Sequence, residues 1–289
     1  MHKHIVRKAF LFLAPAVLLV ILFYTIPMVT SVFYSFTDKA LVGAKSKNWG
    51  FVGFQNYQKM FSDQFFWISL KNTIVLLVCS AIIGQQVVGF FLAQMMEKAN
   101  PLIRKMTGLA VLLGWVTPEV VVSFIFFAFF NKEGSVNSLL GIFGFSPIAW
   151  LYNYAMLSVI IANIWRGTAF SMLMFQSALD NVDTSIKEAA VIDGAGKVQL
   201  LTRITLPLIS GAILTNTILI TLQTLGLFGL IYALTGGGPG FDTTTLPIYM
   251  YNRAFSAYQL GYGTAMAIIL LLFGIGLSLS YMKSMKKQL

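Results

Sequence analysis

The sequence predicts an all-α membrane protein that crosses the bilayer six times. Hydrophobic residues make up 57% of the 289 residues and charged residues only 10%, whereas soluble proteins carry roughly 25% charged residues. The mean hydropathy is +0.78. The apolar residues also gather into six long runs separated by polar segments, which is the pattern expected of membrane-spanning helices.

Each predicted span follows from the thickness of a bilayer, whose core of about 30 Å needs roughly 20 apolar residues in a helix. Six runs meet this length: residues 9–36, 70–96, 106–130, 153–178, 208–234 and 261–282. The first run could be a signal peptide, but no small-x-small cleavage site follows it, so we expect an uncleaved span. With no internal repeat or linker, residues 1–289 are predicted to form a single transmembrane domain.

Basic residues predict the orientation of these spans. The two termini and the segments that follow the second and fourth spans together hold twelve Lys and Arg residues. The opposite side holds seven, and Arg166 lies within the fourth span. By the positive-inside rule, both termini and the loop at 180–207 face the cytoplasm. The same rule accounts for the net charge of +10, so no nucleic-acid partner is expected.

The rarer chemical groups argue against an enzyme. His2 and His4, in the polar N-terminal tip, are the only histidines, and Cys79 is the only cysteine, in an apolar run. No metal site, intrachain disulfide or histidine-dependent catalysis is therefore predicted. The segment "GAGKVQ" hints at a phosphate-binding loop, but Val191 and Val198 stand where that motif needs Gly and Ser or Thr.

The loop at 180–207 is unusually charged for this chain. Ser185 and Glu188 have the spacing of a capping box, so a short helix is expected to start near Ser185, with Gly194 at its end. Ile186, Ala189 and Ala190 would share one face of that helix. The helix could pack against the protein's own spans, but the other cytoplasmic segments are about ten residues or shorter. A separate cytoplasmic subunit is the better partner.

Two extracytoplasmic segments have distinctive compositions. The aromatic-rich stretch "NWGFVGFQNYQKMFSDQFFW" predicts a short helix at the membrane surface, or else a loop packed over the span ends. The stretch "LTGGGPGFDTTTLP" predicts a turn in which Gly236, Gly237 and Gly238 take positive φ.

The charged loop resembles the signature of bacterial ATP-binding-cassette (ABC) importer permeases, which is EAA, three residues, G, nine residues and I-x-L-P. Here it reads Glu188-Ala189-Ala190, then Gly194, then Ile204, Leu206 and Pro207. Further segments, among them "FVGFQNYQKMF", "ANIWRGTAF" and "LTGGGPGFDTTTLP", are similar to the carbohydrate-uptake family of maltose-type and glycerol-phosphate-type binding-protein-dependent permeases.

The resemblance implies a type I importer permease in a bacterial cell membrane, surrounded by lipid and assembled with several partners. These are a homologous second permease, an extracytoplasmic solute-binding protein and two cytoplasmic ATPases, which would hold the ATP and Mg²⁺ while this chain holds no cofactor. The 180–207 loop would form a coupling helix that contacts an ATPase. The residues implied in that contact are Glu188, Ala189, Ala190, Asp193 and Gly194.

Polar groups within spans suggest where a solute binds. Glu119 and Arg166 lie at similar depths on the third and fourth spans, so they could form a structural ion pair or contact the solute. By the resemblance, two helices line the sugar site. The residues implied are Asn163, Arg166, Gly167 and Phe170 on one helix, and Gln223, Thr224 and Leu227 on the other.

The function expected is import of a sugar or oligosaccharide by a non-catalytic subunit. An anionic polyol such as a glycerol phosphate is the alternative solute, with Arg166 as its recognition group. An autonomous secondary transporter would need broken helices, repeat symmetry or a charge relay, and would leave the EAA spacing unexplained.

Overall fold

The computed structural model describes residues 12–97 and 99–286. Its described part is helical apart from loops and an isolated bridge between Thr37 and Phe51. The basic N-terminal tip and the start of the first predicted span lie outside the described residues. The chain divides into two compact units, Met1–Phe66 with Tyr249–Leu272, and Trp67–Ile248 with Phe273–Leu289. That residues 1–289 form a single transmembrane domain stays a prediction.

The first unit is built around a long apolar helix, Phe12–Ser35. It contains the π-helical segment η1 (Ile21–Thr25) and α2 (Ile26–Ser35). The short helices α3 (Ala44–Lys47) and α4 (Gln55–Ser62) follow. Asn56 fixes α4 to the end of α2, because its amide donates to the carbonyl oxygens of Ser35 (2.9 Å) and Thr37 (2.8 Å). The π-helical η4 (Asn252–Ser256) and the start of α18 (Leu260–Lys286) complete this unit.

The predicted helix in the aromatic-rich loop is therefore present as α4, and Phe51, Phe54 and Phe61 around it are exposed. Its position at a membrane surface stays a prediction.

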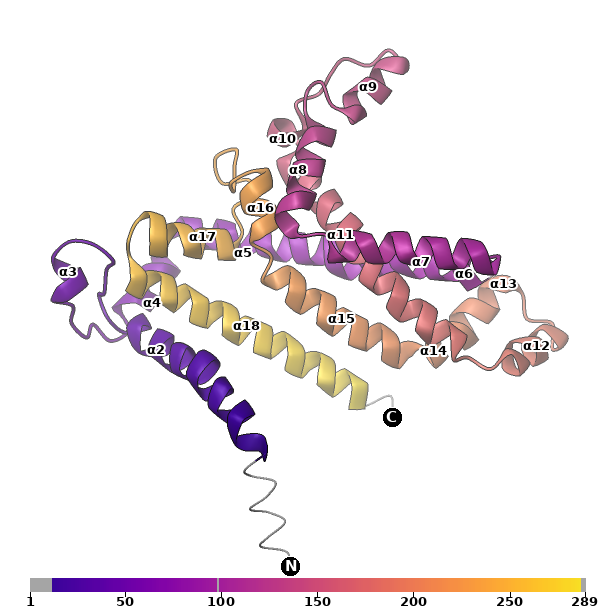
Figure 1. The fold of residues 1–289 in the computed structure, drawn as a ribbon, viewed down its shortest axis with the longest axis horizontal. Coiled ribbons are helices and arrows are strands. Elements are labelled where there is room, and N and C mark those ends of the chain that lie inside the picture. The colour runs from indigo at the N-terminus through magenta and orange to yellow at the C-terminus, as the bar shows by residue number, and fades with distance from the viewer. Residues whose placement is uncertain (1–11, 98, 287–289) are drawn as a thin grey trace, which may run out of the picture. The chain divides into compact units, whose positions relative to one another are not determined.

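The second unit is a bundle organised on one long helix made of α5 (Gln64–Leu76), η2 (Leu77–Gln85) and α6 (Gln86–Glu97). The long helix α11 (Ala155–Asp180) packs along it (Figure 1). Their backbones meet at Gly89, where an added Cβ would lie 2.5 Å from the Ser171 Cβ. α15 (Ser210–Leu225) packs against both.

Buried polar side chains join these three helices. The Asn163 amide donates to the hydroxyls of Ser80 (2.7 Å) and Thr224 (3.3 Å), and Gln85 donates to the Asn163 carbonyl oxygen (3.0 Å). Asn216 on α15 donates to Ser171 on α11 (3.0 Å). Hydrogen bonds of this kind hold helices together where apolar surroundings supply little driving force for association.

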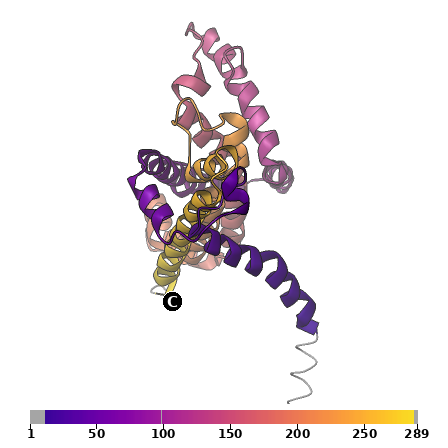
Figure 2. The ribbon, with the colours of Figure 1, turned by 90° about the vertical axis from the view of Figure 1, so that its left-hand side faces the viewer.

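The predicted third span, 106–130, is wrong as a continuous helix. The chain instead forms α7 (Pro101–Val116) and α8 (Glu119–Phe130), which continues toward α9 (Ser135–Ile142) with a bend of 103° from α7. Pro118 explains the break, because it has no N–H to donate and disfavours helical φ/ψ at Thr117. Figure 2 shows α8 leaving the direction of α7.

The predicted fifth span, 208–234, also has different limits. α15 ends at Leu225, and a separate helix α16 (Gly229–Leu234) follows Gly226. Before α15, the segment Lys197–Leu208 bends by 68° from it and comprises α13 (Lys197–Gln199), η3 (Leu200–Thr205) and α14 (Leu206–Leu208). Within the described residues, four helices are individually long and apolar enough to cross a membrane, and up to six if each bent pair is one span.

The apolar core of the second unit gathers around the bend. Val122, Phe126 and Phe130 of α8 pack with Leu227, and with Leu230 and Ile231 of α16. The short α10 (Trp150–Asn153) covers this cluster, since Trp150 packs against it. A second cluster joins α6 to the far end of α11 through Ala93, Met172 and Phe175.

The glycine-rich turn after α16 leads to α17 (Leu246–Tyr251). Gly236, Gly237 and Gly240 have positive φ, so the prediction is right for the first two and wrong for Gly238. Gly238 precedes Pro239, and a residue in that position is biased toward extended backbone. The Thr244 hydroxyl closes the turn by donating to the Gly237 carbonyl oxygen (2.7 Å).

Candidate functional site

A pocket of about 470 Å³ opens where α7 bends into α8. Four helices contribute to it: α7, α8, α11 and α15. The lining residues are Trp115, Val116, Glu119, Arg166 and Gln223. Three of the eight residues predicted for solute contact therefore meet at one cavity, and the break at Pro118 is what places Glu119 at its edge.

Glu119 and Arg166 form an ion pair in this pocket. The Arg166 Nη1 lies 3.3 Å from the Glu119 Oε1, and both side chains remain accessible, at 22% and 31% of their surface. The second carboxylate oxygen, Oε2, accepts from the Leu230 amide (3.3 Å). The pair joins α11 to the start of α8 and of α16, as its structural role predicts, and it also lines the cavity; contact with a solute stays a prediction.

Gly229 permits this arrangement. A Cβ added there would lie 2.8 Å from the Glu119 Oε2, closer than real side chains approach. The Ser123 hydroxyl, one turn along α8, donates to the carbonyl oxygens of Glu119 (2.8 Å) and Leu230 (2.9 Å). α8 and α16 are therefore fastened together directly beside the carboxylate.

The pocket combines groups that bind polar solutes. Among the described side chains, the Arg166 Nε is buried without a hydrogen-bond partner. The Trp115 ring packs on Phe170, with centroids 5.5 Å apart and planes at 32°. A donor nitrogen, a carboxylate, the Gln223 amide and an indole can together hold a ligand that has hydroxyls and an apolar ring face.

The other predicted solute residues lie within the helix packing. Asn163, Thr224 and Leu227 are buried at 3%, 5% and 1% exposure. At Gly167, an added Cβ would lie 2.1 Å from the side chain of Gln85, so this glycine admits a neighbouring helix. Solute contact by these four residues stays a prediction. Trp115 was not predicted to line a site. Its only signal in the sequence is a tryptophan in an apolar run three residues before Pro118.

The predicted loop helix is present as α12 (Thr184–Ile192). Its cap is Asp183, whose carboxylate accepts from the Ser185 amide (2.9 Å), so the predicted Ser185–Glu188 capping box is wrong. Hydrogen bonds from the Ser185 backbone and side chain lower the pKa of Asp183. Gly194 follows the helix with φ of +83°, as the prediction of a glycine stop requires.

α12 is fixed on one side and open on the other. Ala190 is buried, and Lys187 forms an ion pair with Glu97 at the end of α6. Glu188, Ala189, Asp193 and Gly194 are exposed. The apolar residues Ile192 and Val198 are exposed too, at 86% and 73%. The open side thus offers charge and apolar surface together.

Comparisons with known proteins agree with this architecture. Residues 85–283 match the family described as "Binding-protein-dependent transport system inner membrane component". The chain is 34% identical over 278 residues to the sulfoquinovosyl glycerol transport system permease protein SmoG of Agrobacterium fabrum (strain C58 / ATCC 33970), covering 95% of this chain and 89% of SmoG. It is 35% identical over 258 residues to the lactose transport system permease protein LacF of Rhizobium radiobacter, covering 86% and 83%.

A solved structure shares the fold. It is a bacterial alginate ABC transporter in complex with an alginate pentasaccharide-bound periplasmic protein, and one of its chains superposes with a TM-score of 0.81. That match has 23% identity and covers 97% of this chain and 95% of the other. The chain belongs to the inner-membrane components of binding-protein-dependent transport systems, as a non-catalytic permease subunit.

Proposed function

We propose that this subunit imports a sugar or oligosaccharide and binds it in the pocket at the α7–α8 bend. The observation that carries the proposal is the pocket itself, where the Trp115 indole stands beside Glu119, Arg166 and Gln223. Aromatic faces pack on sugar rings, and charged or amide groups exchange hydrogen bonds with sugar hydroxyls. The names of SmoG and LacF, a sulfoquinovosyl glycerol and a lactose transport permease, support a sugar-containing solute.

The charges of the pocket favour a neutral solute over an anionic one. Arg166 is matched by Glu119 at 3.3 Å, so the lining carries no net charge from these two groups. An anionic polyol would meet the Glu119 carboxylate as well as the guanidinium. A hydroxyl can instead donate to the carboxylate and accept from the Arg166 guanidinium, whose side chain is 22% accessible.

Transport would be driven through α12. With the termini and this helix in the cytoplasm, the exposed side formed by Glu188, Ala189, Asp193 and Gly194 would contact an ATPase subunit. Two such ATPases would bind the ATP and Mg²⁺, and a second permease and an extracytoplasmic binding protein would complete the importer. Because α12 is capped at both ends and tied to α6, movement of the ATPase would reach the bundle as rigid-body motion.

The test is ATPase activity of the complete complex in nanodiscs, with the binding protein loaded from a panel of oligosaccharides and sugar phosphates. We expect one neutral sugar to stimulate hydrolysis. Glu188→Lys should abolish that stimulation, whereas Glu133→Lys, an equal charge reversal at an exposed residue outside α12, should preserve it. Stimulation by sugar phosphates alone would contradict the neutral-sugar proposal, and equal losses in both variants would contradict the role of α12.

A further inference from the structure

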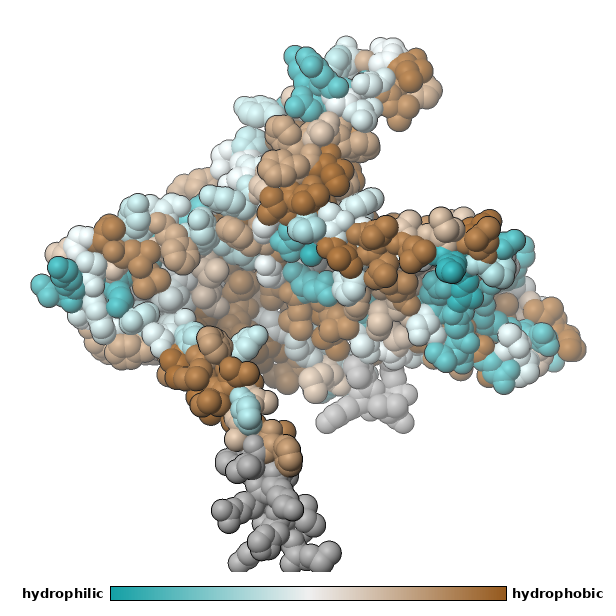
Figure 3. All heavy atoms as spheres, viewed as in Figure 1, coloured by the Kyte–Doolittle hydropathy of each residue, from teal (hydrophilic) through white to brown (hydrophobic). Residues whose placement is uncertain are grey.

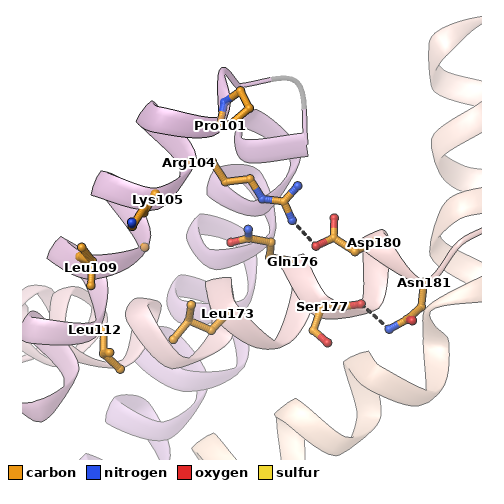
Figure 4. A pocket seen from close by; sticks show the side chains of 11 residues that line it. Pro101, Arg104, Lys105, Leu109, Leu112, Leu173, Gln176, Ser177, Asp180 and Asn181 are labelled. Atoms are coloured by element: carbon orange, nitrogen blue, oxygen red, sulfur yellow. Dashed lines mark hydrogen bonds and ion pairs between the residues drawn. The ribbon is translucent and has the colours of Figure 1, made fainter.

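A second and larger pocket, of about 650 Å³, lies between the start of α7 and the end of α11. Figure 3 shows hydrophilic residues gathered at the end of the molecule where α7 begins, beside hydrophobic surface along the rest of that helix. Figure 4 shows the pocket's lining, with the Arg104 side chain directed at Asp180. None of these residues was predicted to have a role.

Both pockets lie on the same face of the same two helices. On α7 the second pocket uses Lys105, Gly108 and Leu112, and the first uses Trp115, so the lining recurs every three or four residues. On α11 the lining runs from Arg166 through residues 173 and 177 to 180. Arg166 and Asp180 are fourteen residues apart, or about 21 Å along a helix. The two pockets therefore lie along the same faces of α7 and α11, one at each end of this distance.

The stretch of α7 and α11 between the two pockets is apolar. The Trp115–Phe170 ring pair stands between the pockets, and Leu112 and Leu173 follow it at the near end of the second one. Figure 4 shows both leucines at the end of the pocket away from Arg104. The same two helices therefore present a polar site, an apolar section and a second polar site in order.

The end of the second pocket that holds Arg104 carries the same kinds of polar group as the first pocket. Arg104 forms an ion pair with Asp180. With the Gln176 amide assigned so that its oxygen faces the guanidinium, that oxygen accepts from the Arg104 Nε (2.6 Å) and Nη2 (3.0 Å). Among the described residues that line the pocket, Lys105 is exposed and enters no ion pair. The pocket thus repeats the Arg–carboxylate pair and amide of the first, with Lys105 and the exposed Ser177 added.

We propose that this second pocket is an exit subsite, which takes the hydroxyls of the sugar after it leaves the first pocket. The inference rests on the sugar-import function proposed above and on the cytoplasmic placement of α12. A phospholipid headgroup is the other ligand a basic pocket at a membrane boundary attracts. The sugar is favoured because Asp180 offsets Arg104 and because the pocket repeats the groups of the first pocket on the same two helices.

The test uses the complete complex in proteoliposomes. Cys79→Ala is the parent, so that each new thiol is the only one in this chain. Ser177→Cys places a thiol in the second pocket, and Ser171→Cys is the matched control, on the same helix but with 0% exposure. Each variant is treated with a charged methanethiosulfonate reagent from the α12 side. Reaction rate, sugar uptake and stimulation of the ATPase by the loaded binding protein are then measured.

We expect Ser177→Cys to react and Ser171→Cys to stay unreactive. The transported sugar should slow the reaction several-fold, and the modified Ser177→Cys complex should lose most of its uptake while its ATPase is still stimulated. An unreactive Ser177→Cys would overturn the exit subsite, and lipid bound in the second pocket would produce that result. A reaction that neither slows with sugar nor impairs uptake would also overturn it. A parent complex without sugar-stimulated ATPase would instead show that the proposed function itself has failed.

Discussion

At the scale of single residues, the Glu119–Arg166 pair stabilises the helix packing and lines the pocket proposed for the solute. The pair ties α8 to α11 and α16, and both side chains reach the pocket. Replacing one partner would leave the other charge unpaired and partly buried, at a cost below the roughly 3–5 kcal/mol of a fully buried charge. A single variant therefore cannot separate the structural contribution from the binding contribution.

The double variant Glu119→Gln with Arg166→Gln separates them, because it removes both charges and keeps amide groups of similar length. We expect its thermal unfolding midpoint to stay close to that of the parent, while the apparent affinity for sugar in uptake falls about tenfold, equivalent to about 1.4 kcal/mol. Unchanged affinity in a stable double variant would assign the pair a structural role alone.

In the first unit, Asp63 is the centre of a polar cluster between α4 and α5. Its Oδ2 accepts from the hydroxyls of Tyr262 (2.8 Å) and Tyr249, and Arg253 lies 3.5 Å away. Burial alone would raise the pKa of Asp63, but these hydrogen bonds and the guanidinium lower it below the ordinary 3.8. Burial and the hydrogen bond to Asp63 raise the pKa of Tyr249 to about 12.

This lowered pKa sets the direction of a pH effect. The folded protein binds a proton at Asp63 less readily than the unfolded chain, so the cluster stabilises the fold above about pH 3.8 and that contribution is lost as the pH falls through the lower folded value. Asp63→Asn should destabilise the protein at neutral pH by about 1.5–3 kcal/mol, the value of a hydrogen bond to a charged group.

Thermal unfolding of Asp63→Asn and its parent, measured from pH 7 to pH 3, checks this. The two curves should converge below pH 3.8, whereas the exposed Asp242→Asn should follow the parent at neutral pH. A difference that stays constant across the whole range would rule out the ionised carboxylate as its source.

At the scale of elements, the residues at the two ends of α12 determine its length. Gly194 holds φ of +83°, a conformation that costs a residue with a Cβ about 1–2 kcal/mol. Gly194→Ala should lengthen or fray the helix end and weaken the sugar-stimulated ATPase severalfold. Gly196→Ala is the control, because Gly196 has φ of −72° and open space where its Cβ would go. Equal activity in the two variants would show that the end of α12 is not needed for coupling.

The spans were predictable from sequence where the signal is local. Hydropathy over about 20 residues finds α11 and α18, because their apolar runs are also unbroken helices. It does not find the bends, since an apolar window has the same composition whether the chain turns inside it or not. Pro118 marked the third-span break, but prolines also occur within continuous membrane helices when neighbours satisfy the freed backbone groups.

At the scale of the whole chain, the pocket at the α7–α8 bend was harder to predict than α12. The EAA signature occupies consecutive residues, so its spacing identified α12 directly. The pocket instead joins Trp115, Glu119, Arg166 and Gln223 from four helices, and which helix faces meet there depends on tertiary packing. Asn163 and Gly167 share a face with Phe170 in the sequence, yet that packing sets the first two against η2.

On the proposed function, this chain carries sugar only as part of an ATP-driven complex. The most direct measurement is uptake of a labelled sugar into proteoliposomes that contain the complete complex and the loaded binding protein. Accumulation above the external concentration is expected only when ATP is inside the vesicles, and Glu188→Lys should stop it. Equal uptake without ATP, or by this chain alone, would contradict the account.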